Sequence, residues 1–344
     1  MDPPTGGDRG GGALGQRDFP KHVLRRAELG GQPHRISNAA AVVAAEGGPS
    51  AREQQESEKS HGSPLYQNGC LQYLILGAGY TGACVAQRLH RRGLDVIATH
   101  RSTFDATRPG DAGELARRLS PGCRVLHSIP VTGVTDLLEP VLRRASRIVY
   151  LSTTGVYGAA RHVDETTPPA PRTPREHARV EEERSLVRVF PKTLILRPAA
   201  IYGPGRGVHV ALRNGTHRLW GDGSNYISRI HADDLAAIAE AALLCDLAGA
   251  FPVADDHPCP AREISDYCCE VLGLPLLAPS GALPPEDTRA ADRRVDGRAI
   301  RRLLGVALEY PSYRVGIPAC LSSEAATTGA PPSATFRPAG PRRE

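Results

Sequence analysis

The segment YLILGAGYTG, which runs from Tyr73 to Gly82, carries the strongest structural signal in this chain of 344 residues. It places the pattern Gly-x-Gly-x-x-Gly between a short apolar run and a segment rich in Ala and Leu. The first glycine permits a tight turn, the second lets backbone amides approach a diphosphate, and the third lets a helix pack closely on a strand. We expect Gly77, Gly79, Tyr80, Thr81 and Gly82 of this segment to contact the diphosphate. The segment therefore predicts a strand, a dinucleotide-binding turn and a helix whose free amides face the anion.

Short apolar runs alternate with helical patterns along the chain after this segment. We expect strands over 73–76, 95–99, 124–128, 146–152 and 192–197, and helices over 82–92, 111–119, 135–144, 174–187, 232–245 and 264–272. Steady alternation of strand and helix predicts a parallel sheet covered by helices on both faces. The expected fold class is α/β, a doubly wound parallel sheet of the Rossmann type with a smaller C-terminal substrate lobe.

Composition divides the chain into four parts. Residues 1–68 and 321–344 are rich in Gly, Pro, Ser, Glu and Arg and poor in large apolar residues, so we expect a disordered N-terminal extension and a loose tail. Residues 69–202 are expected to form the dinucleotide-binding core. Residues 203–320 would supply the remaining core strand or strands and the substrate-binding lobe.

Charge and residue usage exclude several classes of function. Lys and Arg number 42 against 37 Asp and Glu, and the basic residues are spread along the chain, which argues against a nucleic-acid partner. No apolar run reaches the ~20 residues of a membrane helix, and the first thirty residues lack a secretory pattern. The eight cysteines show no metal-ligand spacing. We therefore expect a cytoplasmic protein that binds neither membrane nor metal.

The tip of the second predicted strand bears on the choice of dinucleotide. An NAD site usually has Asp or Glu there to bind the ribose hydroxyls, about 20 residues after the glycines. Here the tip carries Arg101 and Ser102 and no carboxylate. A guanidinium and a hydroxyl suit a 2′-phosphate, which favours NADP over NAD, with NAD as the other candidate. The alternative is that Arg101 is a solvated surface residue.

Three further motifs follow in order. They are LSTTGVYG (Leu151–Gly158), LRPAAIYGPG (Leu196–Gly205) and RIHADD (Arg229–Asp234). Together with the glycine pattern they resemble the extended or atypical branch of the short-chain dehydrogenase/reductase superfamily, the NAD-dependent epimerase/dehydratase-like proteins. The resemblance covers about residues 71–317.

The resemblance implies a catalytic site in which one expected pair is missing. Thr153 takes the place of the hydroxyl residue that hydrogen-bonds the reacting oxygen. The family's Tyr and Lys, four residues apart on a helix, are replaced in the best register by Arg175 and Arg179. An arginine does not exchange protons in proteins, so Arg179 would hold the nicotinamide ribose and Arg175 would bind an anionic substrate or oxyanion by charge. The alternative is an exposed helix on which both arginines pair with Glu181, Glu182 and Glu183. His177 is a weaker candidate for a proton donor, because it lies on another helix face.

The resemblance assigns four more side chains. Asp105 would lie near the adenine, Ser128 would contact the cofactor, and Tyr157 and Arg229 would contact the substrate. Asp233 and Asp234 are expected to begin a helix, since carboxylates are favourable at that end. Only about twenty residues separate Arg101 from the next strand, where the family has a further helix and strand. Either the sheet has lost that unit or Phe104 fills its place.

Two functions remain at this point. The first is an oxidoreductase or epimerase that moves hydride between NAD(P) and a small polar carbonyl or sugar-type substrate. The second is a catalytically silent NAD(P)-binding sensor or regulatory protein, which the loss of Tyr and Lys favours. A homodimer is the expected assembly if the chain self-associates.

Overall fold

The structure is a computed structural model, and it describes residues 71–130, 132–281 and 292–328. All of these residues belong to one compact unit. The predicted disordered extension (1–68) and the tail beyond residue 328 lie outside the described residues. The predicted division between core and lobe at residue 202 stays a prediction.

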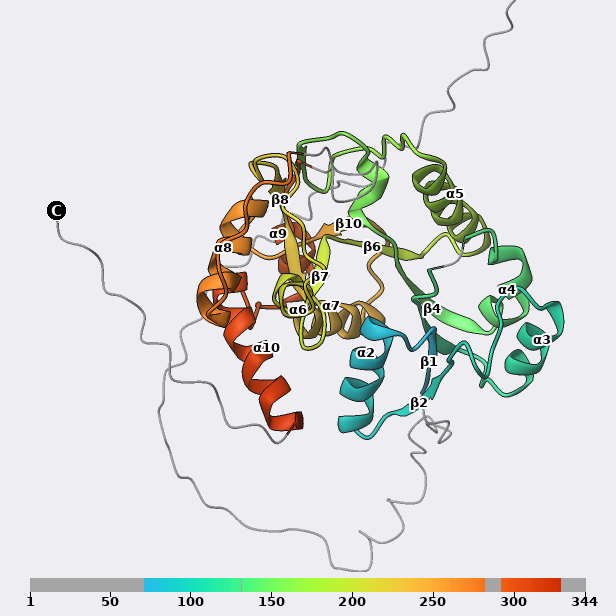
Figure 1. Cartoon of the computed structure of the whole chain (residues 1–344). Helices are drawn as coiled ribbons and strands as arrows, with labels where there is room; N and C mark the ends of the chain where they lie inside the picture. The colour runs from blue at the N-terminus through green and yellow to red at the C-terminus, as the bar shows by residue number, and fades with distance from the viewer. Residues whose placement is uncertain (1–70, 131, 282–291, 329–344) are drawn as a thin grey trace, which may run out of the picture. The chain divides into compact units, whose positions relative to one another are not determined.

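A six-stranded parallel sheet forms the centre of the molecule (Figure 1). Its strands, in spatial order, are β10 (Gly249–Val253), β6 (Leu194–Pro198), β4 (Ala145–Leu151), β3 (Cys123–His127), β1 (Gln72–Leu76) and β2 (Asp95–Ala98). The central strands are mostly buried, and all five residues of β1 are buried. Such strands require cover on both faces, as parallel sheets have.

Helices supply this cover from both sides (Figure 1). On one face lie α2 (Tyr80–Arg91), α7 (Ala232–Leu244) and α9 (Arg298–Leu304), whose apolar residues pack with Ile75, Leu126 and Val149. On the other face lie α3 (Pro109–Arg117), α4 (Thr135–Leu142) and α5 (Pro174–Val189). They enclose Leu74, Val125 and Ile148. Alternate residues of each strand thus enter opposite cores, and the predicted α/β Rossmann-type fold is confirmed.

The edge of the sheet bears on the question of the missing unit. β2 is an edge strand, and residues 99–122 contain α3 but no strand. Phe104 is 8% exposed and packs in the core beneath α3 and α4. The described residues therefore form no strand beyond β2, which favours the alternative of a missing unit, and Phe104 fills apolar volume at the edge of the sheet.

A smaller set of elements adjoins the carboxyl ends of the strands. Three helices, α6 (Val208–Arg213), α8 (Ala261–Leu272) and α10 (Tyr313–Thr328), surround a separate apolar cluster. Three short strand pairs and one turn of 3₁₀ helix, η1 (Thr154–Tyr157), connect this part to the sheet. The pairs are β5 (His162–Val163) with β12 (Arg294–Val295), β7 (Ala200–Tyr202) with β9 (Arg229–His231), and β8 (Tyr226–Ile227) with β11 (Cys259–Pro260).

The expected loose tail was wrong over residues 321–328, because α10 continues to Thr328. Polar composition suggested disorder, but one side chain ties this part of the helix to the rest of the lobe. Glu324 accepts hydrogen bonds from the amide of Gly205 (2.6 Å) and from Arg213, and its Oε1 lies 3.2 Å from Nε2 of His209.

Candidate functional site

The glycine turn between β1 and α2 has the shape that its sequence predicts. Gly77 has a φ of +88°, and a Cβ on Gly82 would lie 2.3 Å from the carbonyl oxygen of Gly77, so neither position accepts a side chain without strain. Gly79 differs, because it is exposed and a Cβ there would meet no atom within 4 Å. The middle glycine therefore faces open space.

The beginning of α2 is suited to an anion. Gly79 is the N-cap and supplies no side-chain hydrogen bond, and the first turn contains no acidic residue. The first amides of a helix have no intrahelical acceptor and carry a partial positive charge. The space at Gly79 leaves these amides open to an anion such as a diphosphate, and the assignment of Gly77, Gly79, Tyr80, Thr81 and Gly82 to cofactor binding stays a prediction.

Two side chains hold the turn in place. The hydroxyl of Thr99, at the end of β2, accepts the amide of Gly77 at 2.9 Å, and its carbonyl accepts the amide of Ala78 at 2.7 Å. Ser128 donates to the carbonyl oxygen of Gly77 at 2.5 Å. Ser128, expected to contact the cofactor, thus binds the turn that would carry it. Thr99 was missed by the sequence analysis, although its place at the tip of the second strand was a usable signal.

The residues expected at the adenine and ribose end lie after β2. Arg101 and Ser102 are exposed in the turn that follows the strand. The carboxylate of Asp105 accepts hydrogen bonds from the hydroxyl and amide of Thr107, at 2.7 and 3.0 Å, and these bonds hold its pKa below the usual range. Arg108 lies 3.6 Å away. Arg101 and Ser102 are therefore free to meet a ligand, while Asp105 is engaged in its own turn.

Thr153 lies at the end of β4 and is partly buried. Its Oγ1 accepts the amide of Gly155 at 3.1 Å and so caps η1, which leaves the hydroxyl proton available for another acceptor. The loop after Thr153 is held by Arg293, whose guanidinium donates to the carbonyls of Thr154 (2.6 Å), Ala160 (3.1 Å) and Gly158. No motif in the sequence pointed to Arg293.

The two arginines of α5 have different surroundings. The helix begins with a capping box between Thr173 and Glu176, and Arg175 is exposed in its first turn. Arg179 is only 9% exposed, and its guanidinium donates to the hydroxyl of Tyr150 at 2.5 Å and to the carbonyl of Pro130 at 2.8 Å. Burial raises the pKa of Tyr150 to about 12 although Arg179 opposes the shift. Arg179 is therefore fixed against the ends of β3 and β4, whereas Arg175 extends into solvent.

The alternative, in which Arg175 and Arg179 pair with three glutamates on an exposed helix, is wrong for all three glutamates. Glu183 is buried, binds Arg197 at 2.6 and 3.1 Å and accepts the hydroxyl of Ser152 at 2.5 Å. Glu182 is also buried and accepts the hydroxyl of Thr135 at 2.7 Å. Only Glu181 is exposed, and it lies near Arg184 and Arg188. No ion pair formed by the described residues joins these carboxylates to Arg175 or Arg179.

The two residues expected to contact substrate lie in the core. Tyr157 is fully buried, and its hydroxyl accepts a hydrogen bond of 3.2 Å from Arg197. Arg229 is 4% exposed and donates to the carbonyl of Ile227 at 2.8 Å and to the thiol sulfur of Cys259 at 3.2 Å. Their polar groups are satisfied within the protein, so this arrangement gives both residues a structural position.

Asp233 and Asp234 lie in the first turn of α7, as predicted, but neither of them caps the helix. The cap is His231, whose Nδ1 accepts the amide of Asp233 at 3.2 Å. Asp234 is buried instead and accepts the amides of Glu309 (2.8 Å) and Tyr310 (3.0 Å). It joins the segment before α10 to the start of α7, which a residue count along the helix could not indicate.

Accessible residues gather where the strands end. Gly79 follows β1, Pro130 follows β3 and Ala200 follows β6, and all three are exposed beside otherwise buried strands, with Thr153 partly exposed after β4. In parallel sheets ligands bind at the carboxyl ends of the strands. This edge, with the glycine turn, Thr153 and Arg179, is the candidate active site.

Within residues 71–130, 132–281 and 292–328, no group of three or more His, Cys, Asp or Glu side chains could hold a metal ion. None of the helices in the part of the chain that the structure describes is long and apolar enough to span a bilayer.

Comparison of the sequence identifies related proteins. Residues 124–249 match the model of the NAD dependent epimerase/dehydratase family. A 3-diazoavenalumate denitrifying reductase from a Streptomyces species is 32% identical over 139 residues, which are 36% of this chain and 45% of that protein. The chain thus matches less than half the length of this curated relative.

Comparison of the structure extends the match over most of the described residues. A functionally unknown conserved protein from Silicibacter pomeroyi is 30% identical, with a TM-score of 0.59 over 73% of this chain and 98% of its own. The UDP-glucose 4-epimerase of Thermus thermophilus, solved with NAD, is 19% identical, with a TM-score of 0.63 over 72% of this chain and 96% of its own. RMD from Pseudomonas aeruginosa, solved with NADPH, is 18% identical, with a TM-score of 0.62 over 75% of this chain and 99% of its own. The last two likenesses show the fold alone. The predicted resemblance to epimerase/dehydratase proteins is confirmed.

Proposed function

Because the chain belongs to the NAD-dependent epimerase/dehydratase family, we propose that it is an NADP-linked oxidoreductase or epimerase-like enzyme. Its substrate would be a small polar carbonyl compound or a sugar derivative, and the reaction would be hydride transfer. The observation that carries the proposal is the shared edge of the sheet. The open glycine turn, the free hydroxyl proton of Thr153 and the charged side chain of Arg179 lie at the ends of β1, β4 and β3.

The amides at the start of α2 would hold the diphosphate, and Arg101 with Ser102 would bind the 2′-phosphate that distinguishes NADP. Both side chains are exposed and follow β2 directly. The bound dinucleotide supplies hydride transfer, which no side chain can perform.

Thr153 would donate its hydroxyl proton in a hydrogen bond to the reacting oxygen. One of its acceptor lone pairs already takes the amide of Gly155, which holds the position of the hydroxyl oxygen before the substrate arrives. Arg179 would stabilise negative charge by its own charge, because an arginine does not exchange protons in proteins. Arg175, exposed in the first turn of α5, would attract an anionic group of the substrate. Water would deliver the proton.

A second candidate is a dinucleotide-binding sensor without turnover. The specific observation in its favour is that Arg179, at the position of the family's lysine, is already hydrogen-bonded to Tyr150 and Pro130. A side chain that is already held by two hydrogen bonds within the protein has less freedom to move with the reacting groups.

Parallel fluorescence titrations with NADPH and NADH test the cofactor. Failure to observe saturable binding of either would remove both candidates. Turnover is tested by following deuterium from labelled NADPH into a panel of aldehydes and keto-sugars. Exchange that falls at least about tenfold in Thr153→Ala supports the enzyme, since one hydrogen bond to a developing charge contributes that much or more. Tight binding without exchange in the wild type supports the sensor.

A further inference from the structure

Residues Gly203–Gly207, which we call the Gly203 turn, pack against the start of α2, where the glycine turn ends. The hydroxyl of Tyr80, the first residue of α2, donates to the carbonyl of Pro204 at 3.0 Å. A Cβ on Gly203 would lie 2.4 Å from that hydroxyl oxygen. The Gly203 turn is thus in direct contact with the part of α2 whose amides would bind the diphosphate.

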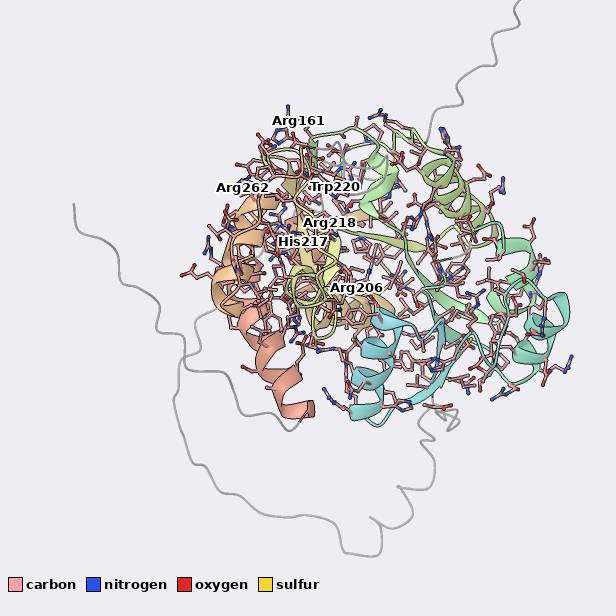
Figure 2. The ribbon with its side chains drawn as sticks, viewed as in Figure 1. Arg161, Arg206, His217, Arg218, Trp220 and Arg262 are labelled. Atoms are coloured by element: carbon pink, nitrogen blue, oxygen red, sulfur yellow. The ribbon has the colours of Figure 1, made fainter. Side chains whose placement is uncertain are left out.

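This turn carries an exposed positive charge. The guanidinium carbon of Arg206 lies 5.3 Å from the centre of the Tyr80 ring, and Nε donates to the carbonyl of Ile201 at 3.2 Å. In Figure 2, Arg206 is labelled beside the first turn of α2. Among the described residues no carboxylate forms an ion pair with Arg206. Its charge is therefore available to an anion at the start of α2.

The position of Arg206 is set by the protein. Gly203 and Arg206 exchange two backbone hydrogen bonds, of 2.9 and 3.0 Å. The amide of Gly205, between them, donates to Glu324 of α10 at 2.6 Å. A fixed backbone reduces the freedom that the side chain loses when it binds, so this arginine is better placed than one on an unrestrained loop.

We propose that Arg206 binds the diphosphate of the dinucleotide from the side opposite the glycine turn. A guanidinium offers paired N–H groups that match phosphate oxygens, and its charge adds to that of the helix amides. The inference rests on the proposed function, because it requires that a dinucleotide occupies the glycine turn. It adds a binding residue outside the four motifs, and it makes the C-terminal part of the chain contribute to cofactor affinity.

The test compares dissociation constants for NADH and NADPH, which share the diphosphate and differ in the 2′-phosphate. Arg206→Gln removes the charge and keeps a polar side chain. We expect both dissociation constants to rise by the same factor, about tenfold, as for a charge-assisted hydrogen bond. Arg206→Lys should recover most of the affinity. Arg218→Ala is the matched control, because Arg218 is an exposed arginine of the same lobe that donates only to backbone carbonyls in the described residues (Figure 2).

The outcomes separate the two proposals. Equal affinities of wild type and Arg206→Gln, with unchanged melting temperatures, overturn the inference and leave the proposed function standing. A loss confined to NADPH also overturns it, since it would place Arg206 at the 2′-phosphate. If the wild type binds neither dinucleotide, the proposed function itself fails.

Discussion

Arg179 of α5 and Tyr150 of β4 share a hydrogen bond of 2.5 Å, and the same guanidinium also donates to the carbonyl of Pro130. One side chain thus joins a helix to the ends of two neighbouring strands. Arg175, one turn earlier, has no such role. Arg175 and Arg179, which the sequence analysis predicted at the positions of the family's Tyr and Lys, are therefore not equivalent, and we expect their substitution to separate stability from binding.

Arg179→Ala should destabilise the fold by about 2–4 kcal/mol, because it leaves the Tyr150 hydroxyl buried without its donor and opens a gap beside the strand. Arg175→Ala, which removes an exposed side chain, should change the free energy of unfolding by less than about 0.5 kcal/mol. Urea denaturation measures both. Equal effects would contradict the structural difference between them.

Substitution by alanine should have different effects at two positions of the glycine turn: at Gly82 it should lower stability, and at Gly79 it should weaken dinucleotide binding. Gly82→Ala forces a Cβ against the carbonyl of Gly77 and should cost about 1–3 kcal/mol of stability. Gly79→Ala has room for its methyl group and should unfold like the wild type, while its dinucleotide dissociation constant rises at least about tenfold because the methyl group occupies the ligand's space. Thermal melting and fluorescence titration report the two quantities. Unchanged dinucleotide affinity in Gly79→Ala would place the diphosphate elsewhere.

Arg101→Ala tests the basis of the NADP preference. Loss of one charge-assisted contact to the 2′-phosphate should weaken NADPH binding about tenfold and leave NADH binding unchanged. Ser102→Ala, which retains the charge, should have a smaller effect. Parallel titration of both dinucleotides gives the ratio directly, and a ratio unaffected by Arg101→Ala would show that this guanidinium is only a surface residue.

Asp255 predicts a dependence of stability on pH. Its carboxylate is 2% exposed, and Oδ2 has no hydrogen-bond partner among the described residues. Burial raises the pKa to about 7 from the ordinary value of 3.8, although Arg229 opposes the shift. The folded state therefore holds this proton more tightly than the unfolded state, so stability falls as pH rises from about 4 to about 7 and the full penalty is present above that range.

Asp255→Asn cannot ionise and should remove this penalty. Relative to the wild type, the variant should gain on the order of 2–4 kcal/mol at pH 8, since one pKa unit corresponds to about 1.4 kcal/mol, and much less at pH 4. Denaturant unfolding at the two pH values makes the comparison. A gain that is the same at both would show that ionisation of Asp255 does not govern stability.

The sequence predicted the sheet well and the side-chain partners poorly. Strands β1 and β4 contain the short apolar runs Tyr73–Leu76 and Ile148–Leu151, so their positions follow from local pattern. The glycine turn follows from the same logic, because the requirement for Gly77 is conformational. Glu183 and Tyr157 are different. Nothing near them in the chain reveals that both bind Arg197, since that contact depends on how α5 packs on the sheet.

Long-range contacts also explain what the sequence did not reveal at two helix ends. Asp234 lies in the first turn of α7 as predicted, yet its carboxylate also binds amides 75 and 76 residues later. Residues 321–328 looked unstructured because they are polar, yet Glu324 meets Gly205 across 119 residues. A pattern within one segment carries no information on such partners.

The loss of a strand beyond β2 has a consequence for the behaviour of the chain in concentrated solution. An outermost strand offers unpaired backbone groups to other molecules, which is a route to aggregation. β2 is only four residues long, and it begins with the exposed Asp95, whose carboxylate accepts a hydrogen bond of 2.9 Å from Gln72. Its shortness and this negative charge at its first residue disfavour the addition of a foreign strand, so the shortened sheet keeps a border that resists self-assembly.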